Sequence, residues 1–222
     1  MKNQRFFNRK FVPAAQIHRL QKGMVINMIF QAAAVLILLA FYGCYFTKMS
    51  SQKKKGIQTD QMGKGKEGFA KYIEITMKIV TILVPATEAA SLFLNISLFP
   101  GWARIMGVVL GVLGVAVFLS AILEMRDSWR AGVSKTERTE LVTGGIYQIS
   151  RNPAFLGFDL VYAGILLMFF NWILLAVTLF AALMLHLQII NVEEDFLITA
   201  FGDTYLEYRK KVNRYFGRKI GK

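Results

Sequence analysis

The segment LVTGGIYQISRNPAFLG, residues 141–157, lies between two strongly apolar stretches and indicates how the chain is organised. Its adjacent glycines at 144–145 favour a turn with unusual backbone angles. Pro153 has no amide hydrogen and suits the first turn of a helix. We therefore expect a loop and a turn, followed by a helix that begins within residues 152–155. This order places Arg151 at the mouth of an apolar helix.

Long apolar blocks flank this segment on both sides. Hydrophobic residues make up 55% of the 222 residues, and the mean hydropathy is +0.42. Because these blocks are long enough to cross a bilayer, we predict an all-α, polytopic membrane protein with about five transmembrane helices. The expected spans are Met24–Phe46, Tyr72–Phe99, Trp102–Leu123, Pro153–Phe170 and Trp172–Asn191. Only Asn171 separates the last two, which predicts a tight C-terminal helical hairpin.

The basic residues lie mainly between the apolar blocks. The formal net charge is +13. Since the sequence shows no nucleic-acid-binding motif, we expect these residues to contact lipid headgroups and to set the topology. Residues 47–71, 125–153 and 191–222 together carry 19 Lys and Arg, against 7 in residues 1–23, 99–104 and 171. The positive-inside rule therefore places the first group in the cytoplasm. The membrane is expected to be the inner or plasma membrane if the protein is prokaryotic. A basic N-terminus on the opposite side fits this topology poorly, unless the first segment does not fully cross.

Two of the expected spans carry features beyond hydrophobicity. In the second span, Pro85 is expected to kink the helix. Glu88 lies near the middle of the membrane, where a carboxylate is costly and is usually functional or paired. The alternative is a packing glutamate neutralised by protonation. In the third span, Gly107, Gly111 and Gly114 lie close to one face and predict close helix packing rather than a dinucleotide site.

The segment SQKKKGIQTDQMGKGKEG, residues 51–68, is rich in lysine and glycine and lacks periodicity. We expect a mobile loop here. Just beyond it, Glu74 and Lys78 are spaced i, i+4 on the second span and are expected to pair near the interface.

The C-terminal region follows the last span. From Asp195 onward its apolar residues are spaced as in two short amphipathic helices on the membrane surface, with a break at Gly202. Glu193 and Glu194 form a carboxylate pair, and His186 precedes Glu193 by two helical turns on the same face. Other interpretations stay open: a solvated helix end for the two glutamates, a packing role for the histidine and a headgroup anchor for the arginine of the loop.

Both polar segments resemble a known family. Residues 141–157 are similar to the motif LVTxGxYxxxRHPxYxG of the isoprenylcysteine carboxyl methyltransferases. The run NVEED at 191–195, followed by FGDTYLEYRKKV, is similar to that family's EE…FGxxYxxYxxxV ending. The resemblance covers residues 141–212, and the same superfamily includes phospholipid N-methyltransferases and, more remotely, sterol reductases. It implies a membrane-embedded methyltransferase that uses S-adenosylmethionine. It also implies that this cofactor is enclosed by the last two spans, the preceding loop and the C-terminal helices.

The resemblance and the residue chemistry together define the expected site. Catalytic roles are expected for Arg151, Glu194 and Glu88, and we expect no metal. Cofactor binding is expected for Leu141, Gly145, Tyr147, Arg151, Asn152, Pro153, His186, Glu193, Glu194, Tyr205 and Tyr208. A carboxylate pair can hold the cofactor's ammonium or ribose hydroxyls, and a guanidinium can bind its carboxylate.

The sequence departs from the family pattern at two positions. Asn152 stands where the family has histidine; it keeps a donor and an acceptor but cannot carry charge. Phe155 stands where the family usually has tyrosine and lacks the hydroxyl. Methyl transfer to a carboxylate needs mainly alignment and desolvation. An amine acceptor would have to lose a proton, for which Glu88, Asp159 or His186 can serve.

The leading hypothesis is a methyltransferase that acts on a lipophilic acceptor, an isoprenyl-cysteine-like carboxylate or another small lipid. The alternatives are a phospholipid amine N-methyltransferase, a sterol-reductase-like enzyme that uses NADPH, and a non-catalytic membrane scaffold. Residues 1–140 are expected to provide scaffold and substrate access, and residues 141–222 the catalytic region. The expected partners are membrane lipids and a lipophilic or lipidated substrate.

Overall fold

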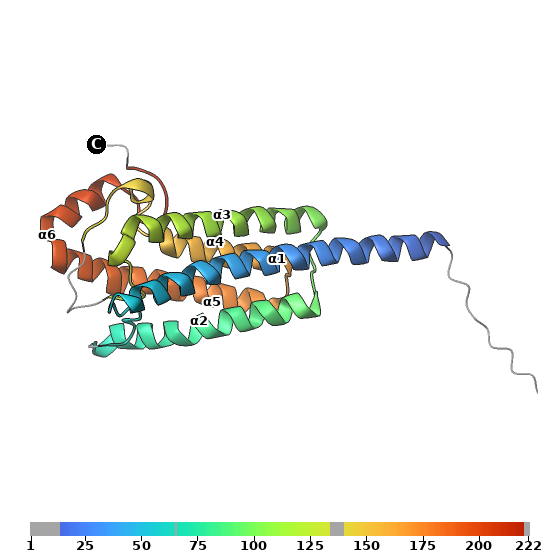
Figure 1. Cartoon of the computed structure of the whole chain (residues 1–222), viewed down its shortest axis with the longest axis horizontal. Coiled ribbons are helices and arrows are strands. Elements are labelled where there is room, and N and C mark those ends of the chain that lie inside the picture. Colours follow the sequence, from blue (N-terminus) through green and yellow to red (C-terminus); the bar gives the residue numbers. More distant parts are fainter. Residues whose placement is uncertain (1–13, 65, 134–139, 220–222) are drawn as a thin grey trace, which may run out of the picture.

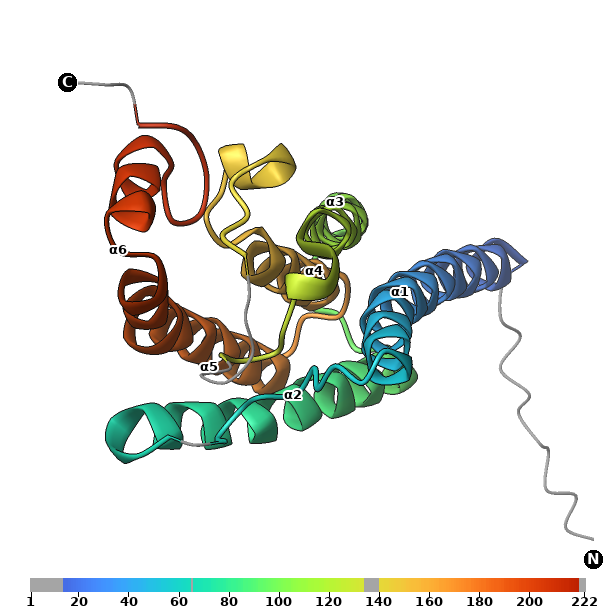
Figure 2. The same cartoon turned by 60° about the vertical axis from the view of Figure 1, so that its left-hand side comes forward.

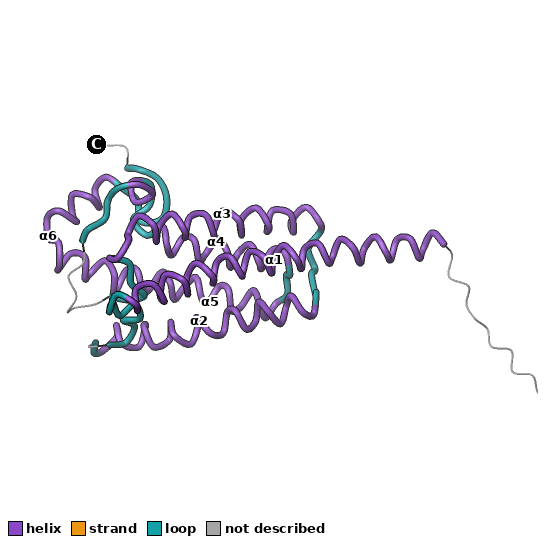
Figure 3. Tube along the Cα trace, viewed as in Figure 1, coloured by secondary structure: helices purple, strands orange, loops and turns teal. Residues whose placement is uncertain are grey.

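The computed structural model describes residues 14–64, 66–133 and 140–219, and helices dominate these ranges (Figures 1 and 3). The all-α prediction is confirmed. The long helices are α1 (Ala14–Lys54), α2 (Gly68–Leu94), α3 (Gly101–Met125), α4 (Pro153–Met168), α5 (Trp172–Gln188) and α6 (Glu194–Lys211). Two single 3-10 turns, η1 (Arg126–Ser128) and η2 (Gly145–Gln148), follow α3, and the π-helical turn η3 (Ile189–Glu193) joins α5 to α6.

Four helical segments are long and apolar enough to cross a membrane, which defines an integral membrane protein. They are Gln21–Lys54, Gly68–Leu94, Gly101–Ser128 and Trp172–Lys211. The expected span Pro153–Phe170 is shorter than predicted, because α4 ends at Met168 after 16 residues. At 1.5 Å per residue it rises about 24 Å, less than a hydrocarbon core of about 30 Å. One face of α4 is fully buried by its neighbours at Val161 and Ile165.

The polar connections gather at one end of the bundle, together with α6 (Figure 1). We call this end the site end. The turns at 95–100 and 169–171 lie at the other end, and α1 continues beyond them. The prediction that the polar segments share one side of the bundle is confirmed. α1 runs along the whole bundle (Figure 1). The structure therefore does not support the alternative that the first segment fails to cross fully. The side of the membrane that the site end faces stays a prediction.

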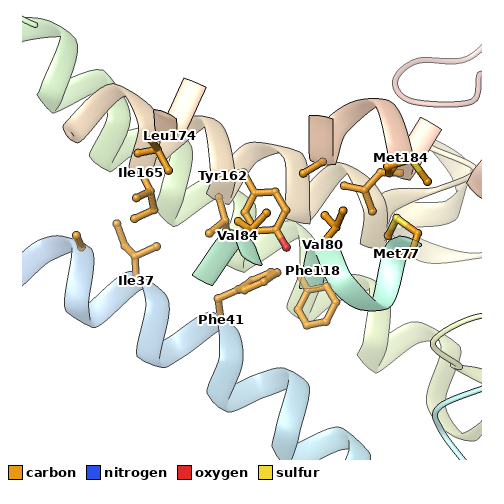
Figure 4. Packing of buried hydrophobic residues seen from close by; sticks show 14 of the residues in the cluster. Ile37, Phe41, Met77, Val80, Val84, Phe118, Tyr162, Ile165, Leu174 and Met184 are labelled. Atoms are coloured by element: carbon orange, nitrogen blue, oxygen red, sulfur yellow. The ribbon is translucent and has the colours of Figure 1, made fainter. Parts of the chain in front are cut away.

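Close packing of α3 on α4 depends on glycine. A Cβ atom at Gly107 would lie 2.5 Å from the carbonyl oxygen of Gly164, and one at Gly114 would lie 2.7 Å from the amide nitrogen of Val161. Because these neighbours are backbone atoms, the two helices would have to separate to admit a side chain. The predicted packing face is confirmed. Figure 4 shows Phe118 of α3 close to Phe41 of α1 in the same core.

The hairpin prediction holds for the short turn at 169–171, whereas the two helices that it joins pack mainly on other partners. α4 lies chiefly against α3, and α5 against α2 (Figure 2). α6 is bent at Gly202, where φ is 50° and ψ is −128°, so the predicted break between two C-terminal helices is confirmed. α2 continues through Pro85 without interruption.

The expected mobile loop at 51–68 is instead held by specific contacts, and that prediction is wrong. α1 extends to Lys54. Near its end, the Gln52 side chain donates to the carbonyl of Trp129 at 2.9 Å and accepts from Thr59 at 2.8 Å. Asp60 then forms a parallel β-bridge with Ala131. Composition cannot reveal the contacts with Trp129 and Ala131, since these residues lie more than about seventy positions further along the chain.

The expected Glu74–Lys78 pair is also wrong. Glu74 is fully buried and pairs with Lys66, which is itself buried. Lys78 pairs with Asp60 at 3.1 Å. A buried carboxylate gains more from a buried ammonium than from a half-exposed lysine on its own helix, since the desolvated charge needs a close partner.

Candidate active site

Arg151 and Glu194 meet at the site end. Arg151 follows η2 and stands two residues before the start of α4, and Glu194 is the first residue of α6. Arg151 Nη2 lies 3.1 Å from Glu194 Oε1, and both side chains are 5% exposed. Arg151 Nη1 donates to the Tyr205 hydroxyl at 2.7 Å. The structure thus brings together three of the predicted site residues from segments far apart in the chain.

Arg214 is a member of this cluster that sequence reasoning missed. Its Nε and Nη2 donate to the two Glu194 oxygens at 2.7 and 3.0 Å. These bonds raise the pKa of the Arg214 guanidinium above its ordinary value. The predicted Asn152 donates to the Arg214 carbonyl at 3.1 Å, so it fixes the tail rather than the charged groups. The motif RKKVNRYFGRK suggested only a headgroup contact, and the one signal for Arg214 was its nearness to the closing motif. We call Arg151, Glu194, Tyr205 and Arg214 the charged cluster.

Glu193 and Glu194, which the sequence suggests as a carboxylate pair, have different side-chain partners in the structure. They stand at the junction of the π-helical turn and α6, and their side chains diverge. Glu194 joins the charged cluster. Glu193 instead accepts from Gln188 Nε2 at 3.3 Å, and the same amide nitrogen lies 3.2 Å from Glu74 Oε1. Single π-helical turns are frequent at functional sites, and this one lies where two carboxylates that adjoin in sequence take different partners.

His186 lies at the end of α5 against the C-terminal tail. Its Nδ1 contacts the Tyr215 hydroxyl, and the two rings stack with centroids 5.9 Å apart. Asp159 of α4 is close enough to Tyr215 for its charge to act there. Burial, followed by that charge, raises the pKa of Tyr215. Asp159 Oδ1 is buried and has no hydrogen-bond partner among the described residues.

Tyr147 and Tyr208 form the wall beside the charged cluster. The Tyr208 hydroxyl donates to the Tyr147 carbonyl at 2.6 Å, and burial raises the pKa of the Tyr147 phenol. Both pack in a small core cluster with Tyr205, and Leu141 packs against it. The close backbone approach predicted for Gly145 is to protein, since a Cβ there would lie 2.6 Å from the Glu124 carboxyl group.

Pro153 is the first residue of α4, as predicted. Glu88 lies elsewhere: it is fully buried within α2, and neither carboxyl oxygen has a hydrogen-bond partner among the described residues. It lies near Tyr42 and Tyr162, and it is not part of the charged cluster. Residues 14–64, 66–133 and 140–219 contain no group of three His, Cys, Asp or Glu placed to hold a metal ion.

A cavity of about 400 Å³ opens between α1, α2, α4 and α5. We call it the apolar cavity, because most of its lining is hydrophobic: Tyr45, Phe46, Met77, Val80, Phe155 and Phe158 contribute to it. Gln188, which binds Glu193, also lines it. Gln188 therefore links the cavity to Glu193. Phe46 and Ile82 at its edge are 53% and 73% exposed on the outer faces of α1 and α2.

These features define a helical membrane protein with a buried charged cluster at one end and an apolar cavity beside it. Residues 102–204 match the family model described as phospholipid methyltransferase. Over these residues, which are just under half of the chain, the protein is similar to that family. The matched region begins in α3 and ends in α6, so it includes Arg151, Glu194 and the wall of α4 and α5.

The chain is also similar to curated proteins named protein-S-isoprenylcysteine O-methyltransferase. It is 33% identical to the protein of Schizosaccharomyces pombe over 109 residues, which is 46% of this chain and 45% of that protein. It is 29% identical to the Xenopus laevis protein over 50% of this chain and 39% of that protein. For protein A of Arabidopsis thaliana the identity is 30%, over 53% of this chain and 64% of that protein. The chain thus matches less than two thirds of the length of each.

Proposed function

We propose that this chain is an integral membrane methyltransferase that transfers a methyl group from S-adenosylmethionine to a lipophilic acceptor. The observation that carries the proposal is the meeting of Arg151 and Glu194 in a buried pair beside the apolar cavity. The family match supports the same reaction class. We further propose that the site end faces the cytoplasm, as the distribution of basic residues predicts.

The charged cluster fits the polar end of the cofactor. S-adenosylmethionine carries an ammonium, a carboxylate and a nucleoside, and when bound it supplies a methyl group on a positively charged sulfur. Glu194 suits the ammonium, and Arg151 suits the carboxylate. Arg151 Nε is buried and has no hydrogen-bond partner among the described residues, so this guanidinium retains an unused donor. The hydroxyl of Tyr205 holds the guanidinium in place.

Other parts of the site bind the acceptor and keep water away from the reacting groups. The apolar cavity takes the hydrophobic part of the acceptor, which can enter between α1 and α2 at the exposed Phe46 and Ile82. Burial excludes water from the reacting groups, and the rigid helices hold them in line.

The charge of the site favours an acceptor that carries a carboxylate. Two guanidinium groups share one carboxylate, so the charged cluster has a formal charge of +1 and attracts an anion. The relatives named isoprenylcysteine O-methyltransferase support this choice. A phospholipid amine is the second candidate, because the family model is that of phospholipid methyltransferases. For an amine acceptor, His186 or Asp159 would hold the proton.

Titration calorimetry in detergent tests cofactor binding. We expect the wild type to bind S-adenosylmethionine, and Arg151→Ala and Glu194→Ala to bind it at least about tenfold more weakly. The matched control is Glu207→Ala, which removes an exposed carboxylate from the same helix as Glu194. Failure of the wild type to bind, or binding of NADPH instead, would refute the proposal.

A labelled-methyl assay with membrane lipids tests the acceptor. A methyl ester releases its label as methanol in alkali, whereas an N-methyl group retains it. Alkali-volatile label would therefore support the carboxylate acceptor, and stable label the amine.

A further inference from the structure

The inner end of the apolar cavity is polar. On α1, the lining residues run from Met49 near the site end to Tyr42, and on α4 from Ala154 to Tyr162. From Ala154 to Tyr162 the α4 stretch rises by eight steps, or about 12 Å along the helix axis. Tyr42 and Tyr162 therefore mark the inner end, and in Figure 4 the Tyr162 hydroxyl is directed toward α1.

The polar atoms at this end are buried and lie close to one another. The Tyr42 hydroxyl is near the Glu88 carboxyl group and the Tyr162 hydroxyl, but none of these contacts has the geometry of a formed hydrogen bond. Glu88 is two helical turns beyond Thr81, a lining residue of α2, and it stands behind Tyr42 rather than in the lining of the cavity. Glu88 is completely buried, so water does not satisfy its carboxyl group from outside the bundle.

Unsatisfied buried polar atoms are costly, and native proteins usually pair them. If the cavity bound only a hydrocarbon tail, a tyrosine hydroxyl and a carboxyl group near its inner end would be destabilising, because the tail offers them no hydrogen bond. Both Glu88 oxygens can accept hydrogen bonds, and Tyr42 can accept one as well. The single Tyr42 proton can serve only one of these acceptors, so acceptors outnumber donors at this end and a further partner would be a hydrogen-bond donor.

We propose that the apolar cavity binds a lipophile with a hydrogen-bond-donating group, a hydroxyl or an amine, at the end remote from the charged cluster, and that the Tyr42 hydroxyl, positioned by Glu88 behind it, recognises this group. If the chain is the methyltransferase proposed above, this molecule is its acceptor: one end is methylated at the site end and the other is held at the inner end of the cavity. Tyr42 then determines specificity, and Glu88 is a positioning residue.

The test uses three ligands that differ only at one end: decanoate, ω-hydroxydecanoate and ω-aminodecanoate. Trp129 lines the apolar cavity, so quenching of its fluorescence reports binding without any cofactor. A Trp129→Phe variant, which keeps the tryptophans outside the cavity, identifies the part of the signal that belongs to the cavity.

In the wild type we expect one of the two ω-substituted ligands to bind about tenfold more tightly than decanoate, the effect of one or two hydrogen bonds. Tyr42→Phe keeps the ring and removes the hydroxyl, and Glu88→Leu removes the carboxyl. Each is expected to reduce the preference, and the double variant to reverse it, because an unpaired polar group then enters an apolar space. Thr81→Val, which removes a different hydroxyl from the cavity wall, is the control that keeps the preference.

The inference fails if decanoate binds the wild type more tightly than both ω-substituted ligands, or if Tyr42→Phe and Glu88→Leu leave the order unchanged. These outcomes are independent of the methyl-transfer assay. A preference without methyl transfer would support the cavity assignment and remove the proposed enzyme, whereas methyl transfer without a preference would do the reverse.

Discussion

Removal of the Glu194 carboxylate should destabilise the protein even without a ligand. Arg151 has 5% of its side chain exposed, so after Glu194→Leu its charge stays buried, and the Tyr205 hydroxyl is its one remaining side-chain acceptor among the described residues. Breaking a buried pair from one side costs about 3–5 kcal/mol. Arg214 has 30% of its side chain exposed and can turn to solvent, so it adds little.

The remaining bond to Tyr205 favours the lower end of this range, about 3 kcal/mol. For a chain of this size, such a loss lowers the midpoint of thermal unfolding by about 6–12 °C. The double variant Arg151→Met, Glu194→Leu leaves no unpaired charge. It should therefore regain most of the loss, with a coupling free energy of about 2 kcal/mol or more.

Thermal unfolding in detergent, followed by tryptophan fluorescence, gives all four values of this cycle. Glu207→Leu serves as the control, because Glu207 is exposed on the same helix and should change stability by less than about 0.5 kcal/mol. If the double variant loses as much as the two single variants combined, Arg151 and Glu194 are not energetically coupled, and the buried pair cannot be the basis of the site.

Three further outcomes are expected. Gly107→Ala should destabilise the protein by about 1–3 kcal/mol, because the added Cβ would lie 2.5 Å from the backbone carbonyl oxygen of Gly164 and would push the two helices apart. Thermal unfolding curves measure the resulting decrease in the midpoint. Phe155→Tyr should change the KM for the acceptor and leave cofactor affinity unchanged, since Phe155 lines the apolar cavity; kinetics and calorimetry separate the two effects. Lys66→Met should destabilise by about 3 kcal/mol by leaving Glu74 buried without its ammonium, and adding Glu74→Gln should restore most of that stability in the same unfolding assay.

Hydropathy identified the long helices because membrane spans are local features of sequence. It overestimated α4 because Phe169 and Phe170 are apolar and read as part of the span. In the structure Phe170 leaves the helix and stacks on Phe99, with ring centroids 4.1 Å apart, so it closes the end of the bundle. Hydrophobicity alone does not distinguish a residue inside a helix from one that covers its end.

The convergence of the motif at 141–157 with the C-terminal region was predictable, since the paired motifs implied it. Arg214 and the ordered contacts of Gln52 were not. A basic run near a membrane end and a loop rich in lysine and glycine are compatible with many structures, and composition does not select among them. Their roles depend on distant partners, Glu194 for the arginine and Trp129 for the glutamine.

Helical geometry itself argued against treating Glu193 and Glu194 as one binding pair. Neighbouring residues on a helix point about 100° apart, so adjacent carboxylates reach a common ligand only when the backbone bends toward it. Here the π-helical turn ends at Glu193, whose carboxylate binds Gln188, a residue of the apolar cavity, while Glu194 holds Arg151. The two glutamates therefore connect the cavity to the charged cluster across a single peptide bond. That connection gives the EE motif a physical reason for two acids, since one holds Gln188 in the lining of the cavity and the other belongs to the charged cluster.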